Sequence, residues 1–213
     1  MAELKNNPLG SLSGKLGNMV ASSWRDINYL RAGSKGSNKE ATLSQVEVRT
    51  RFKMLQDFIM QIKKVVDLGF SNSYTGRSTA VNVAVKVNKD AITGVFPDLS
   101  IDYPAITLST GSLTSCLDAK VEALPEAKIQ VSWVEPGVAE AAEASDKVNI
   151  LIYDVKRQAA AVYNTFLRSD YTAEVSLPAS FANDEVHVWL FFSTPKGEKI
   201  SKSIYVGVVT VEA

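Results

Sequence analysis

Residues that could do catalytic chemistry are few in this chain of 213 amino acids. It contains one histidine, His187, and one cysteine, Cys116. A Ser-His-Asp relay needs a base held by an orienting group, and a zinc site needs several imidazole or thiolate ligands. His187 lies in the alternating run 186–190, which is typical of a strand histidine that points outward, and Cys116 has no thiol partner. We expect no catalytic residue, no metal ligand and no cofactor.

Two other patterns look like parts of enzyme motifs. Residues 10–17, GSLSGKLG, suggest a phosphate-binding loop, but only three residues separate Gly10 from Gly14, and Leu16 stands where a Ser or Thr would hold Mg²⁺. Asp98 and Asp102 lie four residues apart, and paired carboxylates can do acid–base work. Such spacings are common in proteins without catalytic activity. We expect neither pattern to be a site, and we expect the protein not to be an enzyme.

Basic and aromatic residues alternate near the N-terminus. Arginines interleaved with aromatic rings suit phosphate contact and base stacking, and exposed aromatic rings also suit burial against another protein. The excess of positive charge is modest for a nucleic-acid-binding protein. We predict seven interaction residues here: Trp24, Arg25, Tyr29, Leu30, Arg31, Arg49 and Arg51.

The formal net charge of zero conceals a gradient along the chain. Residues 1–70 hold 11 Lys and Arg against 6 Asp and Glu, a net charge of +5. Residues 101–213 hold 9 against 15, a net charge of −6. Opposite charges at the two ends of a chain favour contact with a polyanion or association between copies.

Bulk composition restricts the class of protein. With 46% hydrophobic and 22% charged residues, the chain can bury a core. A single cysteine allows no internal disulfide, the start MAELKNNPLG lacks the apolar segment of a secretion signal, and no run of 18 apolar residues occurs. We expect a cytoplasmic protein (or a virion protein, if the chain is phage-derived) with no membrane partner and no evident small-molecule substrate.

Three segments follow from the local patterns. Residues 1–41 are rich in glycine, serine and asparagine and are predicted to be a basic arm, because they hold too few apolar residues to fold alone. Residues 42–105 are predicted to be a helical segment with a connector, and residues 106–213 a β-sandwich domain. The predicted fold class is therefore α+β.

A long amphipathic helix is predicted over residues 42–68. Thr42 and Gln45 form a capping-box pattern, and Gly69 suits the left-handed position that ends many helices. Apolar residues recur at spacings of three and four, so one face should be buried. Residues 77–93 fit either a strand or a second helix, and periodicity does not decide between them. The side chains expected in the core are Phe52, Leu55, Ile59 and Ile62.

Seven short strands with turn signals between them predict an immunoglobulin- or fibronectin-like sandwich. Trp133 alternates with polar neighbours and should lie between the two sheets. The expected strands are 119–123, 128–134, 147–154, 160–164, 171–177, 185–193 and 201–211.

A resemblance to a known family rests on the first half of the chain. The pattern resembles that of a bacterial family of domains of unknown function, and more weakly that of prophage-encoded structural proteins. The resemblance covers roughly residues 9–115 and implies no activity. A middle segment at residues 91–113 also matches. The residues of the N-terminal pattern are Gly10-x-x-Ser13-Gly14-x-x-Gly17-Asn18-x-Val20, Trp24-Arg25, Tyr29-x-Arg31 and Thr42-x-x-Gln45-x-x-x-Arg49-x-Arg51-Phe52.

The function expected from these features is structural. An arm with aromatic residues that favour burial, opposite charges at the two ends and a sandwich without a recognisable site together favour a non-catalytic assembly protein, a homo-oligomer or larger assembly joined through its arm. One alternative is a nucleic-acid-associated protein that uses the basic arm and the start of the helix. Another is a carbohydrate- or peptide-binding sandwich, for which aromatic side chains grouped on one sandwich face would be the sign.

Overall fold

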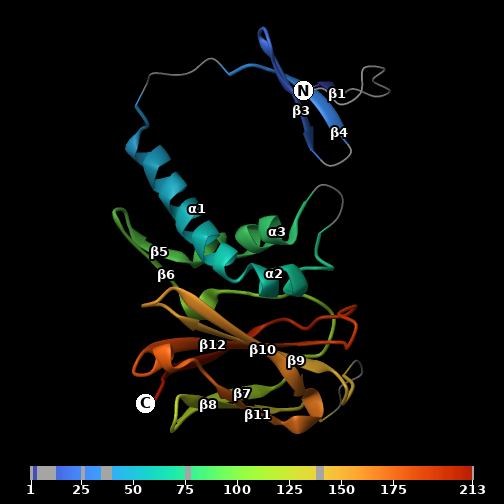
Figure 1. The fold of residues 1–213 in the computed structure, drawn as a ribbon, viewed down its shortest axis with the longest axis vertical. Helices are drawn as coiled ribbons and strands as arrows, with labels where there is room; N and C mark the ends of the chain where they lie inside the picture. Colours follow the sequence, from blue (N-terminus) through green and yellow to red (C-terminus); the bar gives the residue numbers. More distant parts are fainter. Residues whose placement is uncertain are drawn as a thin grey trace. The chain divides into compact units, whose positions relative to one another are not determined.

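The computed structural model describes residues 2–3, 13–24, 27–34, 40–74, 78–137 and 142–212. The chain forms two compact units, Met1–Thr42 and Leu43–Ala213 (Figure 1). The first unit spans the segment expected to be an extended arm, residues 1–41, but it contains a sheet. The expected division at residue 105 does not separate two compact units, because the helical segment and the sandwich share a core in the second unit.

The first unit is a small antiparallel sheet in the order β1-β4-β3-β2, which the sequence analysis did not predict. A two-residue turn, Gly17-Asn18, joins β2 to β3, since Leu16 pairs directly with Met19. Gly17 has a φ of +57°, as the first central position of a type II′ turn requires, and glycine adopts that conformation without steric cost. The strands are β1 (Ala2–Glu3), β2 (Gly14–Leu16), β3 (Met19–Trp24) and β4 (Ile27–Ala32).

The second unit contains the predicted β-sandwich. One sheet has three strands in the order β11-β8-β7, and the other has four in the order β10-β9-β12-β13. All seven predicted strands are present, with ends displaced by three residues at most. The strands are β7 (Asp118–Leu124), β8 (Lys128–Val134), β9 (Lys147–Asp154), β10 (Ala159–Leu167), β11 (Thr172–Ser176), β12 (Glu185–Ser193) and β13 (Ile204–Thr210).

Trp133 lies in the core between these two sheets, as predicted. Its ring packs edge-on against Phe192 with centroids 6.2 Å apart, and its indole N–H donates to the Arg168 carbonyl at 3.1 Å. The Arg168 guanidinium is itself buried and pairs with the carboxylates of Asp146 and Glu135 at 3.2 and 2.8 Å. The charges are paired and the indole is bonded, although one oxygen of the Asp146 carboxylate, Oδ1, is buried with no hydrogen-bond partner among the described residues.

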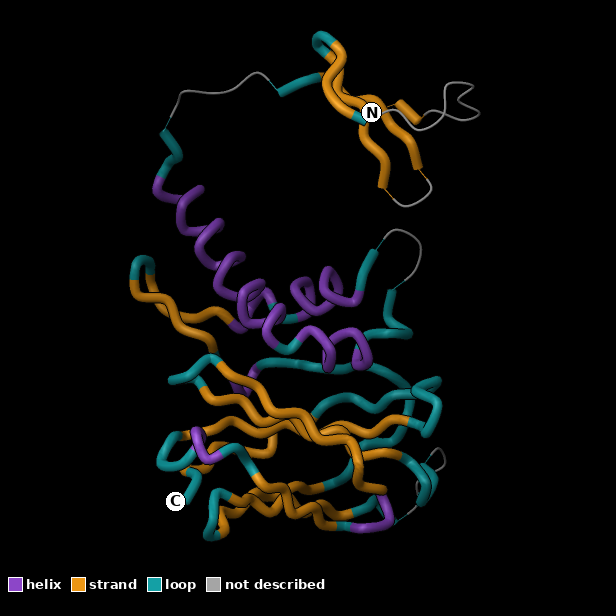
Figure 2. Tube along the Cα trace, in the orientation of Figure 1, coloured by secondary structure: helices purple, strands orange, loops and turns teal. Residues whose placement is uncertain are grey.

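Three helices form a layer on the four-stranded sheet (Figures 1 and 2). The prediction of one unbroken helix over 42–68 is wrong, because α1 ends at Gln61 and α2 begins at Lys63. Ile62, between them, is buried and has a φ of −103° and a ψ of 20°, so the chain changes direction there without glycine or proline. The helices are α1 (Leu43–Gln61), α2 (Lys63–Gly69) and α3 (Ala80–Val87).

The apolar stripe of α1 is buried over only half its length. Leu55, Ile59 and Ile62 are buried as predicted, with 1–2% of their surface exposed. The prediction for Phe52 is wrong, since it is 54% exposed, and Val48, one turn earlier, is 66% exposed. Figure 1 shows that the first turns of α1 extend beyond the rest of the second unit, whereas its later turns pack against it.

Gly69 ends α2 for a different reason from the one predicted. It lies inside the helix as its last residue, it does not have a positive φ, and Phe70 follows as the cap. A Cβ at this position would lie 2.2 Å from the Leu108 carbonyl oxygen, so only glycine lets the two backbones approach this closely.

Within the ambiguous segment 77–93, residues 80–87 form the helix α3, whereas Ile92 and Thr93 already belong to a strand. Thr79 caps α3 by accepting a hydrogen bond from the backbone N–H of Asn82 at 3.2 Å. Gly94 does not cap this helix but lies in a hairpin, with a φ of +91°. The hairpin strands are β5 (Ile92–Val95) and β6 (Asp98–Ile101), and short 3₁₀ turns span Lys89–Ala91, Tyr103–Ala105, Arg168–Asp170 and Ala179–Phe181.

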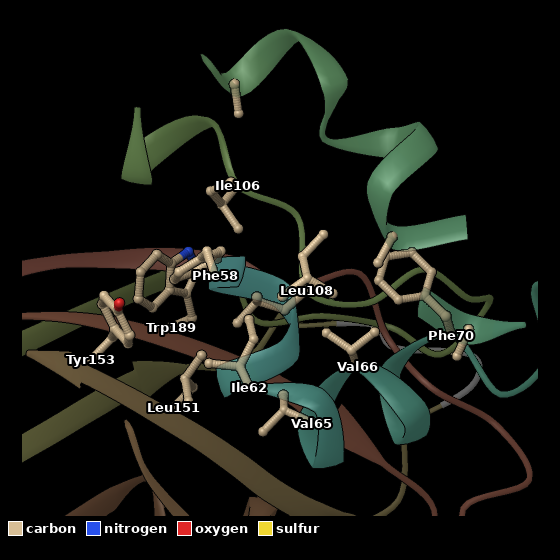
Figure 3. Packing of buried hydrophobic residues seen from close by; sticks show 14 of the residues in the cluster. Phe58, Ile62, Val65, Val66, Phe70, Ile106, Leu108, Leu151, Tyr153 and Trp189 are labelled. Atoms are coloured by element: carbon tan, nitrogen blue, oxygen red, sulfur yellow. The ribbon is translucent and has the colours of Figure 1, made fainter. Parts of the chain in front are cut away.

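A second core lies between the helices and the outer face of the four-stranded sheet. Trp189 from β12 and Leu151 from β9 have no exposed surface and pack with Phe58 of α1 and Leu108 (Figure 3). The alternate residues of the same strands, such as Val188 and Ile150, lie in the core between the sheets. Both faces of the central strands β9 and β12 are therefore buried.

Replacing Leu55 with alanine should lower the free energy of unfolding by about 2–5 kcal/mol, because it removes buried methyl groups and leaves a cavity. Phe52→Ala, on the same helix but exposed, should change it by less than about 0.5 kcal/mol. Urea unfolding of both variants measures the difference. Equal losses would contradict the burial pattern of α1.

Replacing Gly69 with alanine separates two physical effects. Helix propensity alone predicts a gain of about 1 kcal/mol. The close approach of the Leu108 carbonyl instead predicts a loss of about 1–3 kcal/mol, the usual cost of overpacking. Thermal unfolding should therefore show a lower Tm. Gly137→Ala is the control, since a Cβ there meets nothing within 4 Å; a raised Tm for Gly69→Ala would contradict the close packing.

Candidate functional site

The N-terminal sheet brings together three of the seven predicted interaction residues. Directly paired residues of antiparallel strands point to the same face, and alternate residues share a face. The register pairs Ser22 with Tyr29 and Val20 with Arg31, so Trp24, Tyr29 and Arg31 share one face. Leu30, which pairs with Ala21, lies on the opposite face. Arg25 lies outside the described residues.

Apolar side chains occupy both faces of this sheet. Leu16 and Met19, a directly paired couple at the turn, share the face of Leu30 and are 68% and 46% exposed. On the other face, Trp24 is 40% exposed. Among residues 13–24, 27–34 and 40–42, only Ala21 is buried. The sheet is a single layer with apolar groups on two sides.

The other two predicted residues lie on α1 in the second unit. Arg51 holds the β5–β6 hairpin: its guanidinium donates to the Ile92 carbonyl at 2.8 Å and to the Gly94 carbonyl at 2.9 Å, and it pairs with Glu47 at 3.0 Å. These contacts explain Arg51 as a structural residue. Arg49 is exposed on the same helix.

The structure also shows a groove that the sequence did not predict. A hollow of about 530 Å³ lies beside α1, and a second of about 450 Å³ adjoins it. Tyr103 and Val155 line both hollows, so the two lie side by side. We refer to this pair of hollows as the Tyr103 groove.

Aromatic side chains from distant parts of the chain form its inner wall. The Tyr103 ring stacks on His187 with centroids 4.3 Å apart, and Phe58 meets Tyr153 edge-on at 5.0 Å. Burial raises the pKa of Tyr103, and burial raises the pKa of Tyr153 to about 12, so both hydroxyls stay protonated at neutral pH. Tyr103 could have been noticed in the Asp102-Tyr103-Pro104 segment, but nothing in the sequence placed it against β9 and β12.

His187 is part of this wall. As the sequence predicted, it alternates with Val186 and Val188, which face the core between the sheets. Its Nδ1 lies 2.8 Å from the Tyr205 hydroxyl, and burial lowers its pKa, so the ring is neutral at neutral pH. The arrangement positions the imidazole by stacking and one hydrogen bond.

The remaining sequence candidates have structural places. Cys116 is buried, and burial raises the pKa of its thiol to about 11, which leaves little reactive thiolate at neutral pH. Lys15 and Leu16 lie in β2 rather than in a loop before a helix, as a phosphate-binding loop would require. Asp98 begins β6 and is exposed.

Two further searches concern the described residues only. No group of three or more His, Cys, Asp or Glu side chains gathers there in a way that could hold a metal ion. In the same part of the chain, no helix is both long and apolar enough to cross a membrane.

Three solved structures are similar in part to this chain. The FN5 domain of Drosophila Lar matches 48% of this chain and 99% of its own length, at 15% identity and a TM-score of 0.36. The chicken CNTN1 FN1–FN3 domains match 49% of this chain and 34% of their own, at 14% identity and a TM-score of 0.37. An fn3 domain of human contactin 1 matches 57% and 94%, at 12% identity and a TM-score of 0.28.

The fold assignment rests on the strand order and register of the chain itself, in which seven strands divide three and four between two sheets. No curated protein matches the chain. A family model does: it covers residues 11–207, which includes the N-terminal sheet from β2 onward, the helical layer and most of the sandwich. The chain belongs to the family described as "Family of unknown function (DUF6266)".

Proposed function

We propose that this protein is a non-catalytic structural protein that assembles with copies of itself through its N-terminal sheet. The observation that carries the proposal is the single-layer sheet with apolar side chains on both faces. Met19 and Leu16 on one face, and Trp24 on the other, are substantially exposed, while Ala21 is the only buried residue in the described part of this unit.

The energetics favour a covering partner for this sheet. A small sheet is stable in water only when a hydrophobic face packs against something. Burying a side chain the size of leucine or methionine contributes about 1.5–3 kcal/mol. A neighbouring molecule that covered Leu16, Met19 and Leu30 would supply that contribution on one face.

Charge suggests which part of the neighbour would cover it. Residues 1–70 carry a net charge of +5, and residues 101–213 a net charge of −6. Contact between the basic end of one copy and the acidic end of the next would use two different surfaces. Such a heterologous contact generates rings or filaments rather than a closed two-fold dimer.

A second function has a specific observation in its favour. Lys15 pairs with Val20, and Val20 pairs with Arg31, so both cations share a face with Trp24 and Tyr29. A sheet face with aromatic rings and flanking cations suits single-stranded nucleic acid, whose bases stack and whose phosphates need positive charge. Arg51, engaged with Ile92 and Gly94, does not add to this face.

The assembly proposal is tested by light scattering after size-exclusion chromatography. Full-length protein should associate at micromolar concentrations, and a chain lacking residues 1–42 should be a monomer. The double variant Leu16→Ser/Met19→Ser should also be monomeric. The matched control, Val162→Ser/Val208→Ser, removes two similarly exposed side chains (45% and 53%) from the sandwich and should associate normally. High salt should weaken the association, since exposed charge pairs are screened within about 10 Å at 0.1 M.

A full-length protein that stays monomeric in both low and high salt would contradict assembly. If Trp24 and Tyr29 were then protected from proteolysis and hydrogen exchange, the sheet would instead cover its own second unit.

The nucleic-acid alternative makes a separate prediction. A fluorescently labelled single-stranded oligonucleotide should bind with an affinity that falls steeply with the logarithm of the salt concentration. Lys15→Gln/Arg31→Gln should weaken binding, whereas Lys196→Gln/Lys199→Gln, in the hairpin turn of the sandwich, should not. An affinity that does not change with salt concentration, or that both double variants lower equally, would exclude the sheet face as the nucleic-acid contact.

A further inference from the structure

The Tyr103 groove has the size and composition of a ligand site. Ligand pockets commonly have volumes of about 300–1,000 Å³, and each of the two neighbouring hollows lies in that range, at about 530 and 450 Å³.

The aromatic part of the groove is rigid. Phe58 of α1, Tyr153 of β9 and Tyr103 contact one another at centroid distances of 5.0 to 5.8 Å. Tyr103 is fixed from behind by His187, which the Tyr205 hydroxyl holds in turn. A wall that is already ordered loses little entropy on binding a ligand. Phe58 and Tyr153 are buried and Tyr103 is half-buried, so Tyr103 is the ring of this wall that can lie against the C–H face of a sugar.

The polar groups around the aromatic wall include both hydrogen-bond donors and hydrogen-bond acceptors. The Tyr153 hydroxyl donates to the Gln61 side-chain oxygen at 2.7 Å, which orients that amide and leaves its N–H₂ group to donate elsewhere. Asp57 adds acceptors, and Ser100 and Gln158 add groups that both donate and accept. Vicinal hydroxyl groups, which donate and accept at once, match this mixture.

The charge of the larger hollow is balanced. Of the residues that line it, only Lys53 and Asp57 are charged, and their charges are opposite. This balance favours neither an anionic ligand, such as a nucleotide, nor a cation. In the smaller hollow Lys156 pairs with Asp184 at 2.6 Å, and Glu185 is the one further charged residue of its lining. Aromatic surface, amide and hydroxyl groups and mostly paired charges together favour a neutral ligand rich in hydroxyl groups.

We propose that the Tyr103 groove is a carbohydrate-binding site for a neutral oligosaccharide. One sugar ring would lie against Tyr103 in the larger hollow, with its hydroxyls bonded to Asp57, Gln61 and Gln158. The next ring would continue past Val155 into the smaller hollow.

The test uses the isotope-labelled full-length protein and a fixed set of neutral sugars: glucose, galactose, mannose, N-acetylglucosamine, maltose and cellobiose at millimolar concentrations. Two-dimensional NMR should show saturable shifts for at least one sugar. The shifted signals should be the backbone amides of Tyr103 and Tyr153 and the side-chain amides of Gln61 and Gln158. A disaccharide should bind more tightly than its monosaccharide. No saturable shift for any of the six sugars, or shifts confined to other parts of the protein, would overturn the proposal.

Variants locate the site. Asp57→Ala should weaken binding at least about tenfold, the effect of losing one hydrogen bond to a charged group. Asp90→Ala removes an exposed carboxylate that does not line the groove, and binding should be unchanged. Tyr103→Phe keeps the ring and should bind within a few fold of the unmodified protein, whereas Tyr103→Leu should not bind. Equal affinity for the Asp57 and Asp90 variants would also overturn the proposal. This comparison does not depend on whether either tyrosine variant folds.

Discussion

The four-stranded sheet of the sandwich is apolar on both faces, and this constraint requires the helical layer that covers its outer face. In an ordinary exposed sandwich the outer residues of β9 and β12 would be polar. Here Leu151, Trp189 and Phe191 point outward and would contact water without a covering layer. Burial of such side chains is the main favourable term in folding. The helices α1, α2 and α3 therefore belong to the same compact unit as the sandwich. The close approach of Gly69 to the Leu108 backbone shows how tightly the helical layer packs against the segment that leads into the sandwich.

The surface features arise where this covering layer ends. The first turns of α1 extend past the body, which leaves Val48 and Phe52 exposed. On the same helix, the layer gives way to the Tyr103 groove between Thr50 and Gln61, where the half-buried ring of Tyr103, packed against the second core, meets solvent. At the other end of the sandwich, the buried Arg168 with Asp146 and Glu135 closes the core with paired charges. The N-terminal sheet differs from both, because the described residues of its unit form a single layer with apolar side chains on both faces.

The sequence predicted correctly the features that depend only on neighbouring residues. The seven strands and the inward position of Trp133 follow from alternation, which is a property of neighbouring residues. The break at Ile62 has no glycine or proline to mark it, and the exposure of Phe52 depends on where the sheet ends rather than on helical period. Arg51 was predicted to be an interaction residue, because its structural role could not be seen in the sequence: its bonds to the Ile92 and Gly94 carbonyls join residues more than forty positions apart. The groove escaped prediction for the same reason, since it joins residues around 57, 103, 153 and 187.

The hydrogen bond between Gln61 and Tyr153 links residues 92 positions apart, and this separation has a consequence for synthesis on the ribosome. Translation proceeds at about 5–20 residues per second, and proteins fold domain by domain as they emerge. The helices leave the ribosome first, several seconds before the strands they cover. During that interval the apolar stripe of α1 has no sheet to pack on, so it is a natural binding surface for chaperones. The second unit can become native only after β12 has emerged, which makes its folding essentially a late event in the synthesis of each chain.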